Sequence, residues 1–145
     1  DTVYVPIGMG SGICAMIATR DALNLKTKVV GVVSTGAPSY ALSFDMGEVV
    51  STNAALTMAD GIACRVPAQA ALDIILKGAE RVVQVTDDQI MAAMRHYYTD
   101  THNIAEGAGA RWYFGGPSLA NASATVSRAM RSCRAIARCD RPSLR

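Results

Sequence analysis

The stretch of residues 3–16 constrains the fold of this chain more than any other. Apolar residues lead into three glycines at alternate positions, Gly8, Gly10 and Gly12, and helix-favouring residues follow over 13–25. This pattern predicts a buried strand, a tight glycine turn and the start of a helix. The first amides of a helix lack backbone partners, and glycine allows close backbone approach, so such a turn favours a bound anion, most obviously a phosphate.

The glycine turn does not identify its ligand by itself. A dinucleotide-binding fingerprint, G-x-G-x-x-G, needs a third glycine where this chain has Ile13, and an acid after the next strand, where it has Val32-Val33-Ser34. The Gly-Lys-Ser/Thr ending of a nucleoside-triphosphate loop is also missing. A turn that only packs a strand against a helix therefore stays open as an alternative.

Further strands and helices alternate along the first 110 residues. The patterns predict strands over 28–33 and 81–85 and helices over 39–46, 68–76 and from Thr86 to about Thr99, with a last helix starting within 103–110. We expect Pro67 to open the helix over 68–76 at its first position and Gly78 to end it, while residues 48–52 form a brief strand or a connection. The order predicts an α/β fold, a layered open parallel sheet with flanking helices.

Composition is compatible with one globular domain. The chain has 145 residues, of which 50% are hydrophobic, and a net charge of +2. Its four cysteines lack metal-site spacing, and Cys14 and Cys64 stand among apolar residues, which predicts reduced core thiols and a cytoplasmic protein. A strand follows Asp1 directly, so we expect an internal piece of a longer protein.

Four motifs resemble one family in their order and spacing. They are Val5-Pro6-Ile7-Gly8-Met9-Gly10-Ser11-Gly12, Thr57-Met58-Ala59-Asp60-Gly61-Ile62-Ala63, Val85-Thr86-Asp87-Asp88-Gln89-Ile90 and Ala105-Glu106-Gly107-Ala108-Gly109. Together they resemble the pyridoxal-phosphate enzymes of the tryptophan-synthase-β type (fold type II), and within them the serine/threonine dehydratase, or threonine ammonia-lyase, branch. The resemblance covers residues 1–110 and the C-terminal part of the catalytic domain only.

The resemblance implies a cofactor site and a reaction. Pyridoxal 5'-phosphate would be bound through its phosphate by the backbone of Gly8, Met9, Gly10, Ser11 and Gly12. Glu106 would lie at the cofactor pocket, and the Asp60–Gly61 turn would shape it. The family deaminates L-threonine or L-serine to a 2-oxo acid and ammonia. It implies a small amino-acid substrate, a homo-oligomer when full length, and no specific nucleic-acid or membrane partner; the preferred hydroxy amino acid and a biosynthetic (isoleucine) or catabolic role stay open.

The chain also departs from the family. The cofactor-binding lysine of the family precedes the glycine loop, whereas Lys26, Lys28 and Lys77 have no such context, so we expect no catalytic residue in this fragment and no activity of the chain alone. Val33 and Ser39 replace carboxylates that bind a divalent cation in some members, which predicts no metal site. A dinucleotide-binding domain of an oxidoreductase and a non-catalytic module of the same fold are the alternatives.

Residues 111–145 differ abruptly from the partial catalytic domain over 1–110. They hold seven arginines, no lysine and one acid, Asp140, and they lack the Ser-Gly-Gly-Asn-like turn of the family. This composition predicts an aberrant, disordered tail that arose from a reading-frame shift or a chimeric join. Translation of the other two frames after the Ala110 codon should reveal an alanine/leucine-rich helix, a strand and that turn. Frames without them would require another explanation for the tail.

Overall fold

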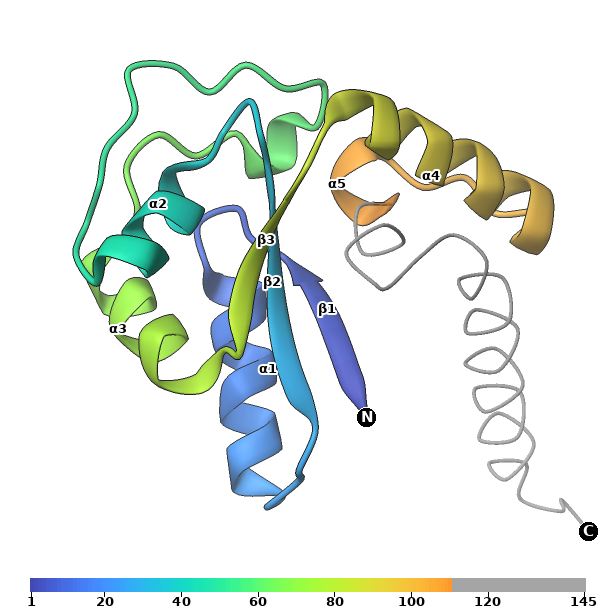
Figure 1. The fold of residues 1–145 in the computed structure, drawn as a ribbon. Helices are drawn as coiled ribbons and strands as arrows, with labels where there is room; N and C mark the ends of the chain where they lie inside the picture. Colours follow the sequence, from blue (N-terminus) through green and yellow to red (C-terminus); the bar gives the residue numbers. More distant parts are fainter. Residues whose placement is uncertain (111–145) are drawn as a thin grey trace, which may run out of the picture.

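Within residues 1–110, three parallel strands form one open sheet in the order β1-β2-β3 (Figure 1). The computed structural model describes residues 1–110, and the predictions for 111–145 lie outside this part of the chain. The strands are β1 Thr2–Pro6, β2 Lys28–Ser34 and β3 Arg81–Val85. In the sheet, Val5 lies opposite Gly31 and Val32 lies opposite Val83. The predicted open parallel sheet and its three strands are confirmed.

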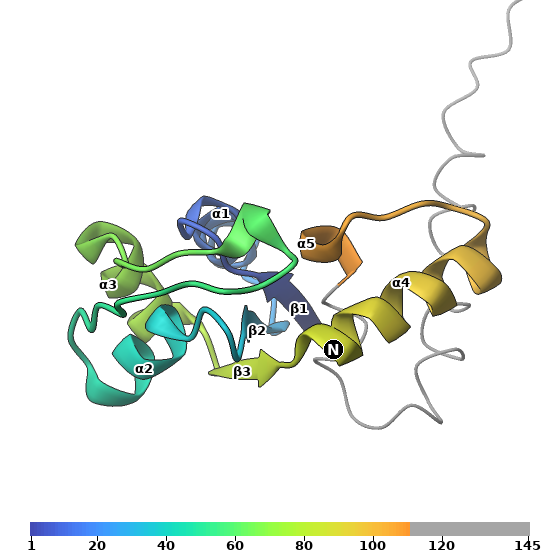
Figure 2. The same ribbon diagram turned by 90° about the horizontal axis from the view of Figure 1, so that it is seen from above.

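Helices cover both faces of the sheet. They are α1 Ser11–Ala22, α2 Ser39–Met46, α3 Gln69–Gly78, α4 Asp87–Thr101 and α5 Gly107–Ala110, with a 3₁₀ turn, η1, at Asp60–Ile62. One face packs against α1, α2 and α3, whereas η1, α4 and α5 lie on the other (Figures 1 and 2). None of these described helices is long and apolar enough to cross a membrane.

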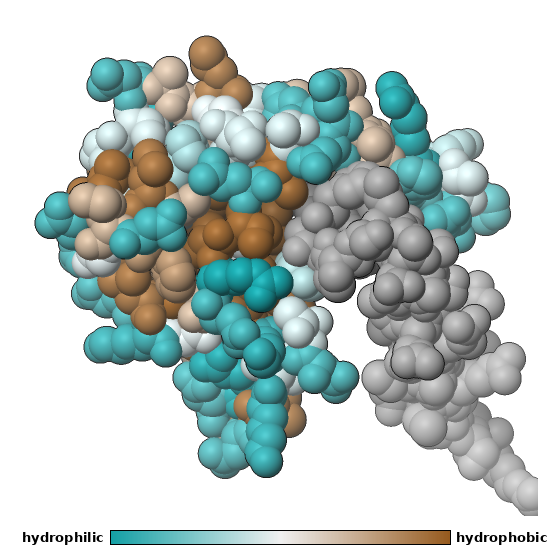
Figure 3. Space-filling view, in the orientation of Figure 1, coloured by the Kyte–Doolittle hydropathy of each residue, from teal (hydrophilic) through white to brown (hydrophobic). Residues whose placement is uncertain are grey.

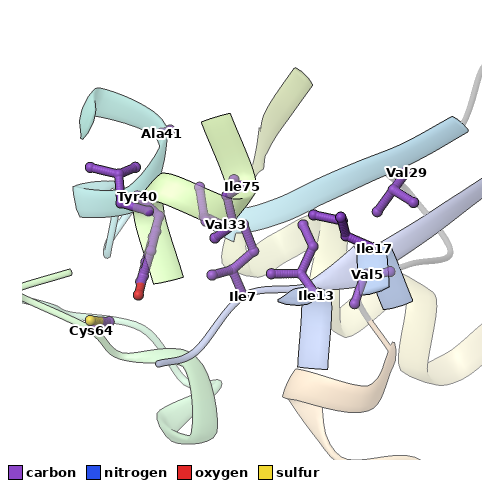
Figure 4. Packing of buried hydrophobic residues seen from close by; sticks show 11 residues of the cluster. Val5, Ile7, Ile13, Ile17, Val29, Val33, Tyr40, Ala41, Cys64 and Ile75 are labelled. Carbon is purple, nitrogen blue, oxygen red and sulfur yellow. The ribbon is translucent and has the colours of Figure 1, made fainter. Parts of the chain in front are cut away.

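The larger core fills the space under α1, α2 and α3. Alternate strand residues point to this face, because successive side chains of a strand project to opposite sides. Its buried members, drawn as sticks in Figure 4, are Val5, Ile7, Ile13, Ile17, Val29, Val33, Tyr40, Ala41, Cys64, Leu72 and Ile75. Burial of each large aliphatic side chain stabilises the fold by about 1.5–3 kcal/mol. At the centre of β2, Gly31 leaves a space that Ile7 occupies, since a Cβ there would lie 2.5 Å from Ile7 Cδ1.

A second core joins the other face to the segments that cross it. Its buried members are Val32, Ala59, Ile62, Val85, Ile90 and Ala108. They come from β2, β3, η1, α4 and α5 and from the segment before η1. This core therefore fixes η1 and α5 beside the ends of β2 and β3.

The predicted bounds of α2 and the predicted start of α4 agree with the structure, whereas α1 ends at Ala22 and not at Leu25. The capping box at α4 is present, since Thr86 Oγ1 accepts from the Gln89 amide at 3.3 Å and Gln89 Oε1 accepts from the Thr86 amide at 2.9 Å. Helix α2 ends at Gly47, which has a φ of 75°. Residues 48–52 form a connection and no strand.

The prediction for the ends of α3 is wrong at both residues. Pro67 precedes the N-cap residue, Ala68, and Gly78 is the last helical residue, followed by Ala79 with a φ of −85°. Gly78 therefore does not end the helix by adopting a left-handed conformation. A Cβ on Gly78 would overlap Ile17 Cγ2, so this glycine allows α3 to pack closely against α1.

Substitution Gly78→Ala should destabilise the protein by about 1–3 kcal/mol, the usual cost of overpacking a core. The matched control is Gly12→Ala in α1, where an added Cβ has no neighbour within 4 Å. We expect that control to be neutral or to stabilise the protein by up to about 1 kcal/mol. Urea denaturation followed by circular dichroism gives both values. Equal stability of the two variants would contradict the packing role of Gly78.

Candidate functional site

Four segments meet at the carboxyl end of the sheet. Ligands of open parallel α/β sheets bind at this end, beyond the last residues of the strands. Here the Ile7 amide donates to Val32 O at 2.9 Å, and the Thr35 amide donates to Val85 O at 3.0 Å. The segment that leads to η1 joins them, since the Leu56 amide donates to Gly36 O at 2.8 Å. The glycine loop thus lies beside residues that are far from it in the sequence.

The glycine loop, residues 8–12, presents free amides at the start of α1. Gly10 is the N-cap residue, with φ 97° and ψ −9°, a left-handed conformation that favours glycine. No side chain caps this helix. The first backbone hydrogen bond of the helix runs from the Cys14 amide to the carbonyl of the N-cap residue, Gly10, at 3.0 Å. Within the described part of the chain, the amides of residues 8–13 donate no hydrogen bond. Such amides favour an acceptor from outside the helix.

The three loop glycines have different surroundings. A Cβ on Gly8 would lie 2.6 Å from Gly61 O, and a Cβ on Gly10 would lie 2.7 Å from Ala71 Cβ. Both directions lead into the protein, whereas Gly12 faces open space. Close packing is thus a second reason for two of these glycines, and the room that they leave for a ligand stays a prediction. Gly8 and Gly10 are required by close packing against other segments.

The predicted residue Glu106 lies beside the same turn that contacts Gly8. A Cβ on Gly61 would lie 3.8 Å from Glu106 Oε1. Glu106 is exposed and stands just before α5, where its carbonyl accepts from the Ala110 amide at 3.0 Å. The Asp60–Gly61 turn therefore lies between the glycine loop and Glu106. The structure brings these predicted residues together, and their role toward a ligand stays a prediction.

Asp87, part of the motif over 85–90 and the first residue of α4, ties the site together. Its Oδ1 accepts from Thr57 Oγ1 at 2.6 Å and from Ser34 Oγ at 3.3 Å, and its Oδ2 accepts from the Met58 amide at 2.9 Å. One carboxylate thus joins the end of β2, the segment before η1 and the start of α4. An acid in the first turn of a helix is also favoured by the helix dipole.

The lysines lie at the opposite end of the sheet. Lys28 begins β2, and Lys26 and Lys77 line the same shallow hollow beside it. Lys28 Nζ pairs with Glu80 Oε1 at 2.6 Å, and all three lysines are exposed, as predicted for surface residues. Hydrophilic residues gather over this end of the molecule, at the bottom of Figure 3. Because the strands are parallel, the length of β2 separates the lysines from the glycine loop.

Ser39 and Val33, which replace metal-binding carboxylates of some family members, are engaged within the protein. Ser39 Oγ is buried and donates to Cys64 O at 2.7 Å, and Val33 is part of the larger core. Among the described residues, no group of three or more His, Cys, Asp or Glu side chains could hold a metal ion. Cys14 and Cys64 are free thiols, as predicted, and burial raises the pKa of Cys14 above its ordinary value.

Fold and site together define an α/β protein with an open parallel sheet, whose loops converge at the carboxyl ends of the strands. A family model described as "pyridoxal-phosphate dependent enzyme" matches residues 1–129, which extends past Ala110. The chain belongs to this family of pyridoxal-phosphate-dependent enzymes. The predicted family and fold type are thereby confirmed.

Relatives of this chain include enzymes that act on threonine or serine by name. The L-threonine ammonia-lyase of Thermotoga maritima is 30% identical over 110 residues, which are 76% of this chain and 27% of that protein. The catabolic L-threonine dehydratase TdcB of Escherichia coli (strain K12) is 31% identical over 110 residues, 76% of this chain and 33% of that protein. The chain thus spans about a quarter to a third of the length of these curated relatives.

Solved structures share the fold. Threonine deaminase isoform 2 from Solanum lycopersicum, in its processed form, superposes with a TM-score of 0.75 at 28% identity, over 88% of this chain and 36% of that chain. Maize serine racemase superposes with a TM-score of 0.73 at 25% identity, over 77% of this chain and 35% of that chain.

Substitution Asp87→Ala should loosen the segment before η1, because it leaves the Met58 amide and the Thr57 hydroxyl without their acceptor. We expect a loss of about 1–3 kcal/mol in the free energy of unfolding, together with faster hydrogen exchange at the Met58 amide. Asp88→Ala is the control, since Asp88 is exposed in the same helical turn. Equal exchange rates at Met58 in the two variants would show that Asp87 does not hold this segment.

Proposed function

We propose that this chain is part of a pyridoxal-phosphate-dependent ammonia-lyase that deaminates L-threonine or L-serine to a 2-oxo acid and ammonia. The observation that carries the proposal is the glycine loop, whose free amides lie at the carboxyl end of the sheet in a member of the pyridoxal-phosphate family. The names of the T. maritima and E. coli relatives support threonine as the substrate class. The family match does not support the alternative of a dinucleotide-binding oxidoreductase domain.

The glycine loop fits the phosphate of the cofactor. Amides from Gly8 to Gly12 lie at the positive end of α1, where the helix dipole favours an anion. The left-handed Gly10 followed by helical residues is the kind of backbone arrangement that makes an anion-binding concavity. Ser11 adds an exposed hydroxyl at the first helical position, and no acid occurs in the loop. We propose that Gly8, Met9, Gly10, Ser11 and Gly12 hold the cofactor phosphate.

The remaining residues of the site shape the cofactor pocket. When bound, pyridoxal phosphate supplies an electron sink for the charge that develops at the substrate α-carbon. The Gly61 backbone and the Glu106 carboxylate form the wall next to the phosphate loop, and Asp87 holds that wall in place through Thr57 and Met58. We propose that Glu106 contacts the cofactor.

Proton transfer is not assigned to a residue of this chain. The three lysines lie at the amino end of the sheet. The described residues therefore anchor the cofactor and restrict the shape of the ligand, but they offer no lysine at the carboxyl end. The proposal therefore treats residues 1–110 as a partial catalytic domain that is inactive alone. It includes a small amino-acid substrate, a homo-oligomer for the full-length protein and a cytoplasmic location, which the free thiols of Cys14 and Cys64 support.

Pyridoxal phosphate should bind the 145-residue chain more tightly than pyridoxal, which lacks the phosphate. Substitution Gly12→Asp should weaken pyridoxal-phosphate binding at least about tenfold, because it adds a carboxylate beside the loop amides in open space. Ala18→Asp is the control, since it adds the same charge to an exposed residue of α1, roughly 9 Å further along the helix axis. Titrations followed by amide NMR shifts give the affinities.

Two results would contradict the proposal. Equal affinities for pyridoxal and pyridoxal phosphate would show that the loop does not recognise phosphate. Release of a 2-oxo acid from threonine or serine by the chain alone, undiminished when each lysine is replaced in turn, would contradict the assignment of the proton-transfer group to another part of the protein. Phosphate-dependent cofactor binding by a full-length protein that does not turn over these amino acids would favour the non-catalytic module.

A further inference from the structure

Tyr40 is a buried tyrosine whose hydroxyl reaches the glycine loop. Its side chain is only 1% exposed and belongs to the core under α2. In Figure 4 the ring descends from α2, and the hydroxyl oxygen points toward the segment that carries Cys64. A Cβ added to Gly10 would lie 3.0 Å from this oxygen, so the loop passes directly against it.

The hydroxyl makes two hydrogen bonds whose directions are determined. The Ala68 amide donates to Tyr40 Oη at 3.2 Å, and an amide cannot accept in return. The single hydroxyl proton is therefore donated to Met9 O, at 2.8 Å. Burial raises the pKa of Tyr40 above its ordinary value, so the hydroxyl keeps this proton at neutral pH.

The bond to Met9 determines the orientation of the next amide. A trans peptide group is planar, and its C=O and N–H point in opposite directions. Since the Met9 carbonyl points inward to Tyr40, the Gly10 N–H of the same peptide group points away from the core. This amide donates to no acceptor in the described part of the chain.

Gly10 makes the orientation of this peptide group easy to lose. A glycine adopts positive and negative φ with similar ease, so the Met9–Gly10 peptide group can rotate at little backbone cost. Rotation would turn the Met9 carbonyl outward, and its partial negative charge would then repel an anion at the loop. The hydrogen bond from Tyr40 opposes this rotation.

We infer that Tyr40 is a positioning residue for phosphate recognition. It holds the Met9 carbonyl inside the protein, so that the Gly10 amide faces the bound phosphate. This inference rests on the proposed function of the glycine loop. Tyr40 does not contact the ligand and acts only through the peptide group that it orients.

The test compares Tyr40→Phe with Tyr4→Phe in the 145-residue chain. Both substitutions remove one hydroxyl, and Tyr4 stands on β1 close to the loop, half-buried and packed against the other core. Dissociation constants for pyridoxal phosphate and for pyridoxal are measured by NMR titration. The ratio of the two dissociation constants reports phosphate recognition. Partial unfolding does not change this ratio, because a smaller folded fraction lowers the apparent affinity for both ligands equally.

Tyr40→Phe should reduce the preference for the phosphorylated ligand about tenfold, which is the upper range for one lost hydrogen bond. The Gly10 amide resonance should shift in the free protein, and Tyr4→Phe should change neither property. An unchanged ligand ratio in Tyr40→Phe, with the wild-type chain still preferring the phosphorylated ligand, would overturn the inference and leave the proposed function intact. A wild-type ratio near one would overturn both.

A second variant separates loop positioning from support of α3. Ile75→Val removes one buried methyl group from α3, at a cost of about 0.5–1.5 kcal/mol that is similar to the loss of one hydrogen bond, and keeps both hydrogen bonds of Tyr40. Its ligand ratio should equal that of the wild-type chain. A reduction as large as that of Tyr40→Phe would show that Tyr40 acts by supporting α3, which would overturn the inference.

Discussion

The pairing of β2 with both neighbouring strands is the constraint on which the rest of the structure depends. Every residue of β2 after Lys28 is buried, and the parallel register aligns the carboxyl ends of all three strands at one edge. The glycine loop, the loop after β2 and the start of α4 must therefore meet there. The segment before η1 joins them through Gly36 and Asp87, so residues far apart in the chain form one site.

Local patterns in the sequence predict much of this fold, because strand and helix signals repeat over a few residues. The three strands, α2 with its Gly47 end and the capping box of α4 depend on such short-range signals. The ends of α3 were predicted wrongly, because Gly78 serves a contact with Ile17 on another helix. The same limit applies to the site. The Tyr40–Met9 bond joins residues 31 apart, and the Thr57–Asp87 bond joins residues 30 apart, so no local pattern reports either.

The two ends of the sheet differ in the kind of hydrogen-bond donor that each presents. The amino end carries Lys26, Lys28 and Lys77 as exposed charges, with Lys28 paired to Glu80. The carboxyl end offers an anion the amides of residues 8–13, which belong to the backbone and have no rotamers to order. Amides are weaker donors than ammonium groups, so their number and direction decide the strength of such a site.

In the proposed phosphate site the direction of each amide matters, so residues that do not contact the ligand contribute to its affinity. Three kinds of contact restrict the loop: the turn at Gly61 against Gly8, the hydroxyl of Tyr40 on the Met9 carbonyl, and Ala71 against Gly10. All three come from segments that the parallel sheet brings to its carboxyl end, and all are buried or backbone contacts. In the proposed function, phosphate anchoring is thus a property of the packed core, whereas proton transfer requires only a side chain within reach of the substrate. The two proposed tasks are physically separable, which is compatible with a glycine loop that has no lysine beside it in the part of the chain that the structure describes.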